Sequence, residues 1–436
     1  MSKKSFILII LFVFILITGT LFYIYFFKET VTPTNTNTVP TTEFPFGTTP
    51  DNNTNNINNG GDNNTNNTNA NNTNGNTSGT STDKIGNLYS KIRQIYQKPN
   101  SGAILTTKNT KNYLRFVDRA TGNIYEYLIS NDNSDLTRIT NTTLPKIQES
   151  TWFNSGDKII LRYVDNSNNI VSFLGKISTT SKDSVGEILG NFLTPNQRQV
   201  VINPDNTNIF ELLDKKDNSG SYGNMYSVST SSNKKQIFDS QLSIWNISWP
   251  QNDIITFNTK PTYKDYGYLF FLNTKTYSFD RVLGDIIGLT TNINKDVSLI
   301  AYSGLLVNSF GLDIYDIKNK ESKNIKLKTL SDKCVWSNSN SKHLYCAVPK
   351  NNTNGNYPDD WYKGNISFND DFWMIDAEDG TTKLIYESMK EDNLTLDAFD
   401  LKLNSDDKYL AFTNKNDLSL WLLELPDTTT QKAPIQ

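Results

Sequence analysis

Short apolar runs that alternate with polar residues dominate the chain from residue 100 to residue 425. The runs are rich in Ile, Leu, Val, Tyr and Phe, and Asn, Asp, Ser and Gly separate them. Runs of this kind with regular turn signals are typical of an all-β sandwich, barrel or propeller. One stretch departs from the pattern, because Ile85, Leu88, Tyr89, Ile92 and Ile95 follow a helical spacing. The pattern predicts an all-β fold, with a helix as an alternative in that stretch.

A unit made of an apolar or aromatic residue, a polar turn and an apolar strand recurs along the chain. Its copies are "TWFNSGDKIILRY" from Thr151, "NFLTPNQRQVVIN" from Asn191, "SWPQNDIITF" from Ser248, "TTNINKDVSLIAYS" from Thr290, "VWSNSNSKHLYCAV" from Val335 and "LKLNSDDKYLAFT" from Leu401. Most spacings match the propeller-blade period of about 40–50 residues, and the two longer ones require insertions. The repeats therefore predict a propeller.

Further strands complete most units. Third strands are expected at 170–177, 225–230, 268–273, 312–317 and 372–377, and fourth strands at 137–141, 186–190, 235–239, 280–284, 323–327 and 383–387. An earlier unit has its first three strands at 102–107, 112–118 and 123–129. The total is seven units, with six or eight blades as alternatives.

The seventh unit, which ends with the apolar run 418–425, has no fourth strand after it. The segment "IRQIYQ" at 92–97 has the composition of the other fourth strands. A ring with an open seam would leave a sheet edge and an apolar blade face unpaired. We therefore expect 92–97 to pair with 418–425 and close the ring, with a short helix at 84–90 before it.

The segment from Phe6 to Phe27 contains no charged residue. Its 22 residues would span about 33 Å as a helix, enough to cross a bilayer core of about 30 Å. No small-residue cleavage pattern follows it, so we interpret it as an uncleaved signal anchor. Lys3 and Lys4 precede the run, and this predicts a cytoplasmic tail at 1–5 and an extracytoplasmic remainder.

Composition divides the rest of the chain. Residues 28–83 are rich in Asn and Thr and poor in apolar residues, so they are expected to form a disordered linker. The propeller domain is predicted to cover 84–427, and 428–436 would be a flexible tail. The net charge is −3, which argues against a nucleic-acid partner, because such proteins present a basic face.

The segment "NSDDKYLAFTNKNDLSLWLL" at 404–423 resembles the PD40, or TolB-like, variety of the WD40-like repeat. In that family a Ser-Pro-Asp-Gly turn precedes a buried strand. Here Ser405, Asp406 and Asp407 occupy the turn, so Pro and Gly are replaced. The resemblance covers about residues 100–425 and implies a membrane-anchored bacterial propeller of seven or six blades that binds partners. The motif itself implies a structural role.

No catalytic constellation stands out. His343 is the only histidine, and its place within an expected strand favours a surface or edge position over a triad or zinc site. No G-x-S-x-G segment occurs, and no residues remain for a hydrolase domain. We therefore predict no catalytic residue, cofactor or metal site, and no enzymatic activity.

Cys334 and Cys346 are each six residues from Asn340, the centre of an expected hairpin turn. In a symmetric hairpin they would face each other within reach of a disulfide. An extracytoplasmic location permits oxidation. The alternative is a pair of buried free thiols.

Long insertions are expected at 204–224, 258–267 and 349–369, on the face where successive blades are joined. Aromatic side chains on a shared face favour a binding site, because Tyr and Trp combine apolar area with a polar group. The alternative is that these loops fold back over the ring and bury them. Asp370 and Asp371 follow the last loop, and acidic turn residues are the default interpretation over calcium ligands. The candidate binding residues are Tyr222, Tyr263, Tyr266, Tyr357, Asp359, Asp360, Trp361 and Tyr362.

These observations predict a membrane-tethered extracytoplasmic propeller that binds or scaffolds an envelope protein, peptide or glycan. The membrane itself would be contacted through Phe6 to Phe27. An alternative of another class is a carbohydrate-active or hydrolytic enzyme that uses Asp359, Asp360 and carboxylates at the channel mouth. A third is a spacer or sensor ectodomain.

Overall fold

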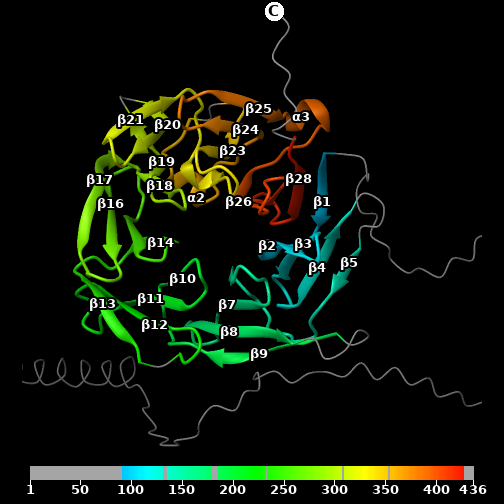
Figure 1. Cartoon of the computed structure of the whole chain (residues 1–436), viewed down its shortest axis with the longest axis vertical. Helices are drawn as coiled ribbons and strands as arrows, with labels where there is room; N and C mark the ends of the chain where they lie inside the picture. The colour runs from blue at the N-terminus through cyan, green and yellow to red at the C-terminus, as the bar shows by residue number, and fades with distance from the viewer. Residues whose placement is uncertain are drawn as a thin grey trace, which may run out of the picture. The chain divides into compact units, whose positions relative to one another are not determined.

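The computed structural model describes residues 91–130, 135–178, 185–231, 233–306, 309–351 and 354–426. These residues form seven four-stranded sheets arranged as blades around a central channel (Figure 1). The predicted seven-bladed propeller is thus confirmed. No helix in these ranges is long and apolar enough to cross a bilayer. The expected signal anchor, linker, 84–90 helix and C-terminal tail lie outside the described residues, and the domain boundaries stay predictions.

In six of the seven blades the strands are arranged in chain order from the channel outward, and blade 7 takes its outer strand from the N-terminal side of the chain. Blade 1 holds β2 (Asn100–Lys108), β3 (Lys111–Asp118), β4 (Ile124–Ile129) and β5 (Leu136–Arg138). Blade 2 holds β6 (Glu149–Trp152), β7 (Lys158–Val164), β8 (Ile170–Ser178) and β9 (Glu187–Phe192). Blade 3 holds β10 (Gln199–Ile202), β11 (Asn208–Asp214), β12 (Ser221–Ser227) and β13 (Lys235–Ser240).

The next three blades repeat this order. Blade 4 holds β14 (Trp245–Gln251), β15 (Ile254–Thr259), β16 (Tyr266–Asn273) and β17 (Phe279–Ile287). Blade 5 holds β18 (Thr290–Ile293), β19 (Leu299–Leu306), β20 (Ser309–Asp316) and β21 (Glu321–Ile325). Blade 6 holds β22 (Cys334–Trp336), β23 (His343–Pro349), β24 (Asp370–Asp376) and β25 (Thr382–Tyr386). Three short helical segments complete the described elements: η1 (Ser331–Lys333), α2 (Asp359–Tyr362) and α3 (Ser388–Glu391).

Blade 7 joins the two ends of the described chain. It contains β26 (Ala398–Leu403), β27 (Tyr409–Asn414), β28 (Leu420–Glu424) and, as its outer strand, β1 (Ile92–Tyr96). The register pairs Ile92 with Leu423 and Tyr96 with Leu420, in antiparallel order. In Figure 1 the blue β1 lies beside the red β28. The predicted closing strand is therefore confirmed, and the helical alternative is wrong for residues 92–96.

Burial follows the position of each strand in its blade. The second strands are buried on both faces because neighbouring blades cover them, and β27 is buried at every residue. Outer strands are more exposed, as in β21, where only Ile325 is buried. Large side chains fill the space between blades, and Tyr345, Phe372 and Phe412 belong to one cluster between blades 6 and 7. This layering explains why the second strands read as continuous apolar runs.

The recurrent polar turn has a structural role. The Asn404 side chain accepts a hydrogen bond from the Tyr409 backbone N–H at 2.9 Å, and Asn203 accepts one from Asn208 at 2.7 Å. Asp407, within the first of these turns, has a φ of 55°. Asn and Asp tolerate this left-handed conformation better than most residues, which explains how they replace the glycine of the family motif.

In the unit predicted to begin at Asn191, the strands are assigned to the wrong positions in the blade. The sequence predicts the apolar run at 199–203 as the second strand, whereas it forms the first strand, β10, and the second strand is β11. Two polar turns, "TPNQR" and "NPDN", flank β10, and only the second lies between paired strands, with Ile202 opposite Ile209. The expected insertion at 204–224 therefore contains β11, and the loop between β11 and β12 is 215–220.

Cys334 and Cys346 lie opposite each other on β22 and β23 and form a disulfide. Both side chains are buried. The predicted pairing is confirmed, because the six-residue spacing on each side of the turn is kept in the hairpin.

Candidate functional site

The ring encloses a cavity of about 1200 Å³, which we call the channel cavity. Its walls come from the innermost strands β2, β6, β22 and β26, together with η1 and α2. Each of these strands ends its sheet, so one backbone edge faces the channel. The uncharged polar lining residues are Asn100, Ser101, Gln148, Ser150, Thr151, Asn154, Asn338, Ser405 and Thr413, and the aromatic ones are Trp152, Trp361, Tyr362 and Phe399.

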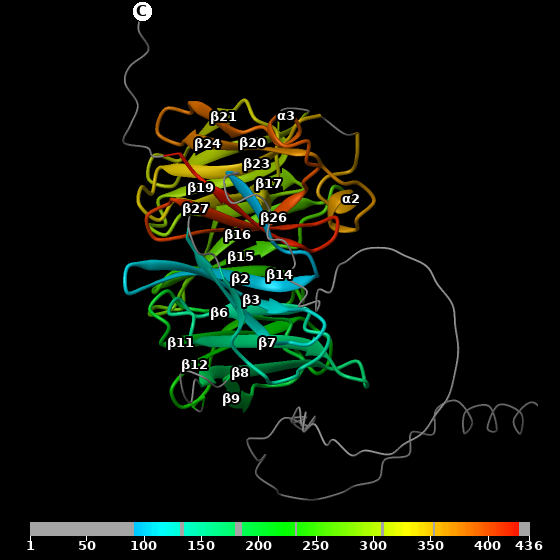
Figure 2. The ribbon, with the colours of Figure 1, turned by 90° about the vertical axis from the view of Figure 1, so that its right-hand side faces the viewer.

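A long loop of blade 6, residues 350–369 apart from 352–353, projects on one face of the ring (Figure 2). We call it the cap loop, and it carries α2. It reaches across blade 5 to blade 4, because Asp359 accepts a hydrogen bond from the Tyr263 backbone N–H at 2.7 Å. Over blade 5, the rings of Tyr357 and Phe310 lie 4.8 Å apart. The cap loop is thus anchored to two other blades.

A buried charged cluster attaches the cap loop to blades 6 and 7. The Lys333 Nζ lies 2.8 Å from Asp370 Oδ2 and 2.6 Å from Asp397 Oδ1, and all three side chains are fully buried. The same Nζ donates to the Ala398 carbonyl at 2.8 Å. Burial raises the pKa of Asp370 to about 6, against the attraction of Lys333. The three groups join η1, β24 and the start of β26.

Trp361 completes this cluster from the cap loop. Its Nε1 lies 3.0 Å from each carboxylate oxygen of Asp397, and its side chain is 4% exposed. The Lys333 Nζ lies 5.0 Å from the ring centroid, and the Lys415 Nζ lies 5.3 Å from it. Trp361 therefore anchors the cap loop and forms part of the cavity wall.

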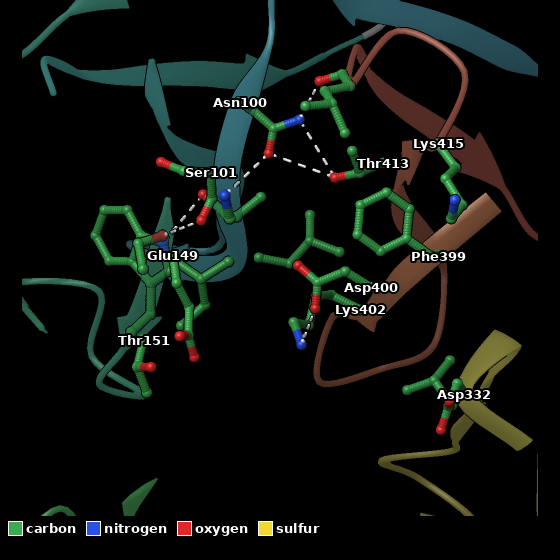
Figure 3. A pocket seen from close by; sticks show the side chains of 18 of the residues that line it. Asn100, Ser101, Glu149, Thr151, Asp332, Phe399, Asp400, Lys402, Thr413 and Lys415 are labelled. Carbon is green, nitrogen blue, oxygen red and sulfur yellow. Dashed lines mark hydrogen bonds and ion pairs between the residues drawn. The ribbon is translucent and has the colours of Figure 1, made fainter. Parts of the chain in front are cut away.

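The charged residues that line the channel cavity are Arg119, Glu149, Asp332, Asp400, Lys402 and Lys415. Three of these side chains are paired with an opposite charge: Glu149 with Arg162, and Asp400 and Lys402 with each other at 2.7 Å. Asp332 accepts a hydrogen bond from the Tyr362 hydroxyl. Burial raises the pKa of Asp332. Burial also lowers the pKa of Lys415, against the attraction of Asp397. Figure 3 shows Lys415 beside Phe399 at this part of the wall.

Of the predicted binding residues, only Trp361 and Tyr362 line the channel cavity among the described residues. Tyr362 is 40% exposed. Tyr357 lines a second cavity of about 290 Å³ on the cap loop, together with Phe310, Leu330 and Phe368. The alternative interpretation, that the loops fold back over the ring, thus holds for Trp361.

The other candidates do not gather at the cavity. Tyr222 is a strand residue of β12, opposite Leu213, and Tyr266 begins β16 with 60% exposure. Asp359 holds the blade 4 loop, and Asp360 accepts hydrogen bonds from Asn356 and Asn365 at 2.8 and 3.1 Å. Both acidic residues therefore hold the cap loop together.

Several residues of the site carried no usable sequence signal. Asn100, Arg119 and Lys415 stand in ordinary turn or strand-edge contexts, and only the ring closure brings them to one cavity. Lys333 carried no signal either, because it follows the polar residues Ser331 and Asp332 and has the sequence context of a turn before β22. Asp370 was expected as an acidic turn residue, and it instead binds Lys333.

The described residues contain no group of three or more His, Cys, Asp or Glu side chains placed to hold a metal ion. His343 lies 3.7 Å from Asp376 and 3.1 Å from the Asn340 amide nitrogen, at the β22–β23 turn. It is not among the residues that line either cavity described above.

No protein-family model matches the chain, and its sequence matches no curated protein. Among solved structures it is similar to TolB from Acinetobacter baumannii, with a TM-score of 0.41, 12% identity, and coverage of 65% of this chain and 62% of that one. It is also similar to an oligogalacturonate lyase in complex with manganese (TM-score 0.46, 10% identity, coverage 77% and 100%). A third is oligogalacturonate lyase from Vibrio parahaemolyticus (0.48, 11%, 77% and 94%).

The chain thus spans less than two thirds of the TolB chain. TolB, after which the family inferred from the repeats is named, is among the solved structures that this chain resembles. The count of seven blades rests on the sheets of this chain itself.

Proposed function

We propose that this chain is a membrane-tethered, extracytoplasmic propeller that binds an extended segment of another cell-envelope protein in the channel cavity. The apolar segment from Phe6 to Phe27 and the preceding Lys3 and Lys4 support the tether and its orientation. The channel cavity supports the binding role, and the disulfide fits an oxidising compartment.

The observation that carries the proposal is the combination of groups around the channel cavity. Each inner strand has one edge that faces the channel and pairs with no other strand of its sheet. Backbone groups on this edge and polar side chains such as Thr151 and Ser405 together line the cavity. Phe399 and Tyr362 add apolar area at the same wall. An extended polypeptide presents the same mixture of amide groups and apolar side chains, so the two surfaces are complementary.

The position of Trp361 favours a polypeptide over a glycan. Sugar rings pack on exposed aromatic faces, and Trp361 is 4% exposed, with the ammonium groups of Lys333 and Lys415 near its ring. The neighbouring cavity of Phe310, Leu330, Tyr357 and Phe368 offers room for an apolar side chain, a group that polypeptides carry.

Site-specific photo-crosslinking in cells tests the proposal. A photoreactive phenylalanine analogue replaces Tyr362, at the cavity, or Tyr266, which is exposed but outside the cavity. We expect protein adducts from position 362 and not from 266. A second variant, Thr151→Trp, places a large side chain in the channel cavity and should reduce the adducts.

Alanine at Trp361 is not a clean test, because this side chain anchors the cap loop. Adducts that form equally at both positions, that are undiminished in Thr151→Trp, or that are glycans would each overturn the proposal. Absence of adducts at position 362 would overturn it as well.

A further inference from the structure

The second cavity described above has an apolar floor and a polar rim, and we call it the cap-loop cavity. Its floor contains Leu330 and Phe368, which are 0% and 5% exposed. Thr329 also lines it, but its hydroxyl already donates to the Ala347 carbonyl at 2.7 Å. The exposed rim residues are Lys328, Asn351 and Asn354. An apolar floor inside a polar rim is the form of a pocket that binds an apolar anchor group.

Aromatic rings form the sides of the cap-loop cavity. The ring centroids of Phe310 and Tyr357 lie 4.8 Å apart, and those of Tyr357 and Phe368 lie 5.8 Å apart. A phenyl ring that enters the cavity can pack against the faces or edges of these rings. The volume of about 290 Å³ is at the lower end of ligand pockets, which measure about 300–1,000 Å³. The cavity therefore suits one or two side chains better than a larger ligand.

One cation stands at the rim of the cap-loop cavity without an opposite charge. Lys328 is exposed and forms no ion pair with any residue that the structure describes. A ligand with a carboxylate next to an apolar group would match both the rim and the interior of the cavity.

The chain itself carries this combination, in a part of the sequence that lies outside the described residues. Phe44 and Phe46 are the only aromatic residues between residues 28 and 83, and Glu43 directly precedes them in "EFPFG". Pro45 restricts Phe44 to extended conformations, so less conformational entropy is lost when the segment binds. The rest of this range is mainly Asn and Thr, so this motif is its largest apolar group.

The length of the chain allows the motif to reach the cavity. Residues 47–90 separate the motif from Lys91, the first described residue. As a flexible coil, these 44 residues would span about 33–40 Å root-mean-square. A domain of about 340 residues has a radius of gyration of about 20 Å, so the coil is long enough to reach across it. Because the contact is intramolecular, its effective concentration is about millimolar, and a weak contact can be occupied.

We propose that residues 43–46 bind in the cap-loop cavity of the same chain, with a phenylalanine ring in the apolar interior and Glu43 beside Lys328. This contact leaves residues 28–42 between the predicted membrane anchor and the propeller, a length of at most about 54 Å. It therefore holds the cap loop close to the membrane. A partner whose apolar side chain enters the cavity has to displace the motif first.

Photo-crosslinking within the full-length chain tests the proposal. A photoreactive phenylalanine analogue replaces Phe46 or, as the matched control, Ile57, another apolar residue between 28 and 83. Adducts within one chain are separated by size and located by mass spectrometry. We expect position 46 to join to the peptides that carry Phe310, Leu330 or Tyr357. Its yield should be at least about tenfold above that of position 57, the factor that corresponds to burial of one phenyl ring.

A blocked cavity should lose the adduct. Asn351→Trp places a large side chain at the rim, and Asn166→Trp, in an exposed turn of blade 2, is the matched control. We expect the first variant to lower the yield about tenfold and the second to leave it unchanged. Thermal unfolding confirms that both variants are folded.

An exchange of charges tests the contact between Glu43 and Lys328. Lys328→Glu and Glu43→Lys should each lower the yield about twofold to fivefold, the range for an exposed ion pair, and the double variant should restore it. Lys326→Glu is the matched control, because Lys326 is also exposed and does not line the cavity.

Equal yields from positions 46 and 57, adducts between two chains, or adducts that map to the channel cavity would overturn the proposal. A yield that Asn351→Trp leaves unchanged would do so as well. If the double charge variant does not restore the yield, the contact between Glu43 and Lys328 is wrong. The proposed function stands in each of these cases, because it depends on the channel cavity.

Discussion

Replacing Lys333 with methionine tests whether the buried charged cluster holds the cap loop. The methionine keeps the apolar stem of lysine and removes the ammonium group. It leaves Asp370 and Asp397 buried without their cation, at positions where the Nζ lay 2.8 and 2.6 Å away. Trp361 and the Ala398 N–H still donate to these carboxylates, so part of the network persists.

The expected loss of unfolding free energy is about 3–5 kcal/mol, the range for removing one partner of a buried ion pair. Most of this loss comes from leaving the buried carboxylates without a cation, and less of it comes from the lost attraction itself. An exposed ion pair would contribute less than about 1 kcal/mol. Lys342, which is 50% exposed and 2.6 Å from Glu378, therefore provides the matched control Lys342→Met.

The loss should also depend on pH. The pKa of Asp370 rises from 3.8 to about 6 on folding, so the folded chain binds more protons than the unfolded chain between these values. The contribution of Asp370 to stability is therefore highest below about pH 4 and falls by about 3 kcal/mol as the pH rises through 6. Without Lys333 the pKa of Asp370 rises further. We expect the deficit of Lys333→Met to be smaller at pH 5 than at pH 8.

Urea denaturation of the full-length chain, followed by tryptophan fluorescence at both pH values, measures these differences. Trp361 lies in the cluster, so its emission should report release of the cap loop. A Lys333→Met chain within about 1 kcal/mol of the wild type at pH 8 would refute the reasoning. A deficit equal to that of Lys342→Met, or one that is larger at pH 5, would do the same.

Two further predictions concern the closure of the fold. Reduction of the Cys334–Cys346 disulfide, or replacement of both cysteines by Ser, should lower the free energy of unfolding by about 3 kcal/mol, because the bond closes a short loop in the unfolded chain. Calorimetry with and without reductant measures this difference. Equal transition temperatures would contradict the prediction. Ile92→Ala in the closing strand should lower the free energy of unfolding by about 2–5 kcal/mol and increase proteolysis near β28, because the Ile92 side chain is only 4% exposed. Lys91 is exposed, so the control Lys91→Ala should change neither the stability nor the proteolysis. Equal proteolysis of the two variants would show that β1 does not hold the last blade.

Local patterns were sufficient for much of the fold. The apolar runs located most of the third and fourth strands, and the closing role of 92–96 followed from the count of strands in the last unit. The cysteine pair followed from its symmetry about Asn340. The unit near Asn191 failed because two similar turns flank β10, and local composition does not tell a hairpin turn from a connection between blades.

The candidate site could be predicted only in part. Trp361 and Tyr362 were found because aromatic residues in a long loop are conspicuous, yet Trp361 proved to be buried against Asp397. Arg119 and Lys415 are almost three hundred residues apart in the sequence and meet one cavity only after the ring has closed.

By itself, the sequence determined the strands, their grouping into repeats and the need for a closing segment, because these follow from the two-residue period and from pairing between near neighbours. The tertiary structure alone decided which polar groups are buried together and which face the channel. Burial depends on contacts between blades that are distant in sequence, and charges such as Lys333 and Lys415 differ only in the neighbours that the ring brings to them.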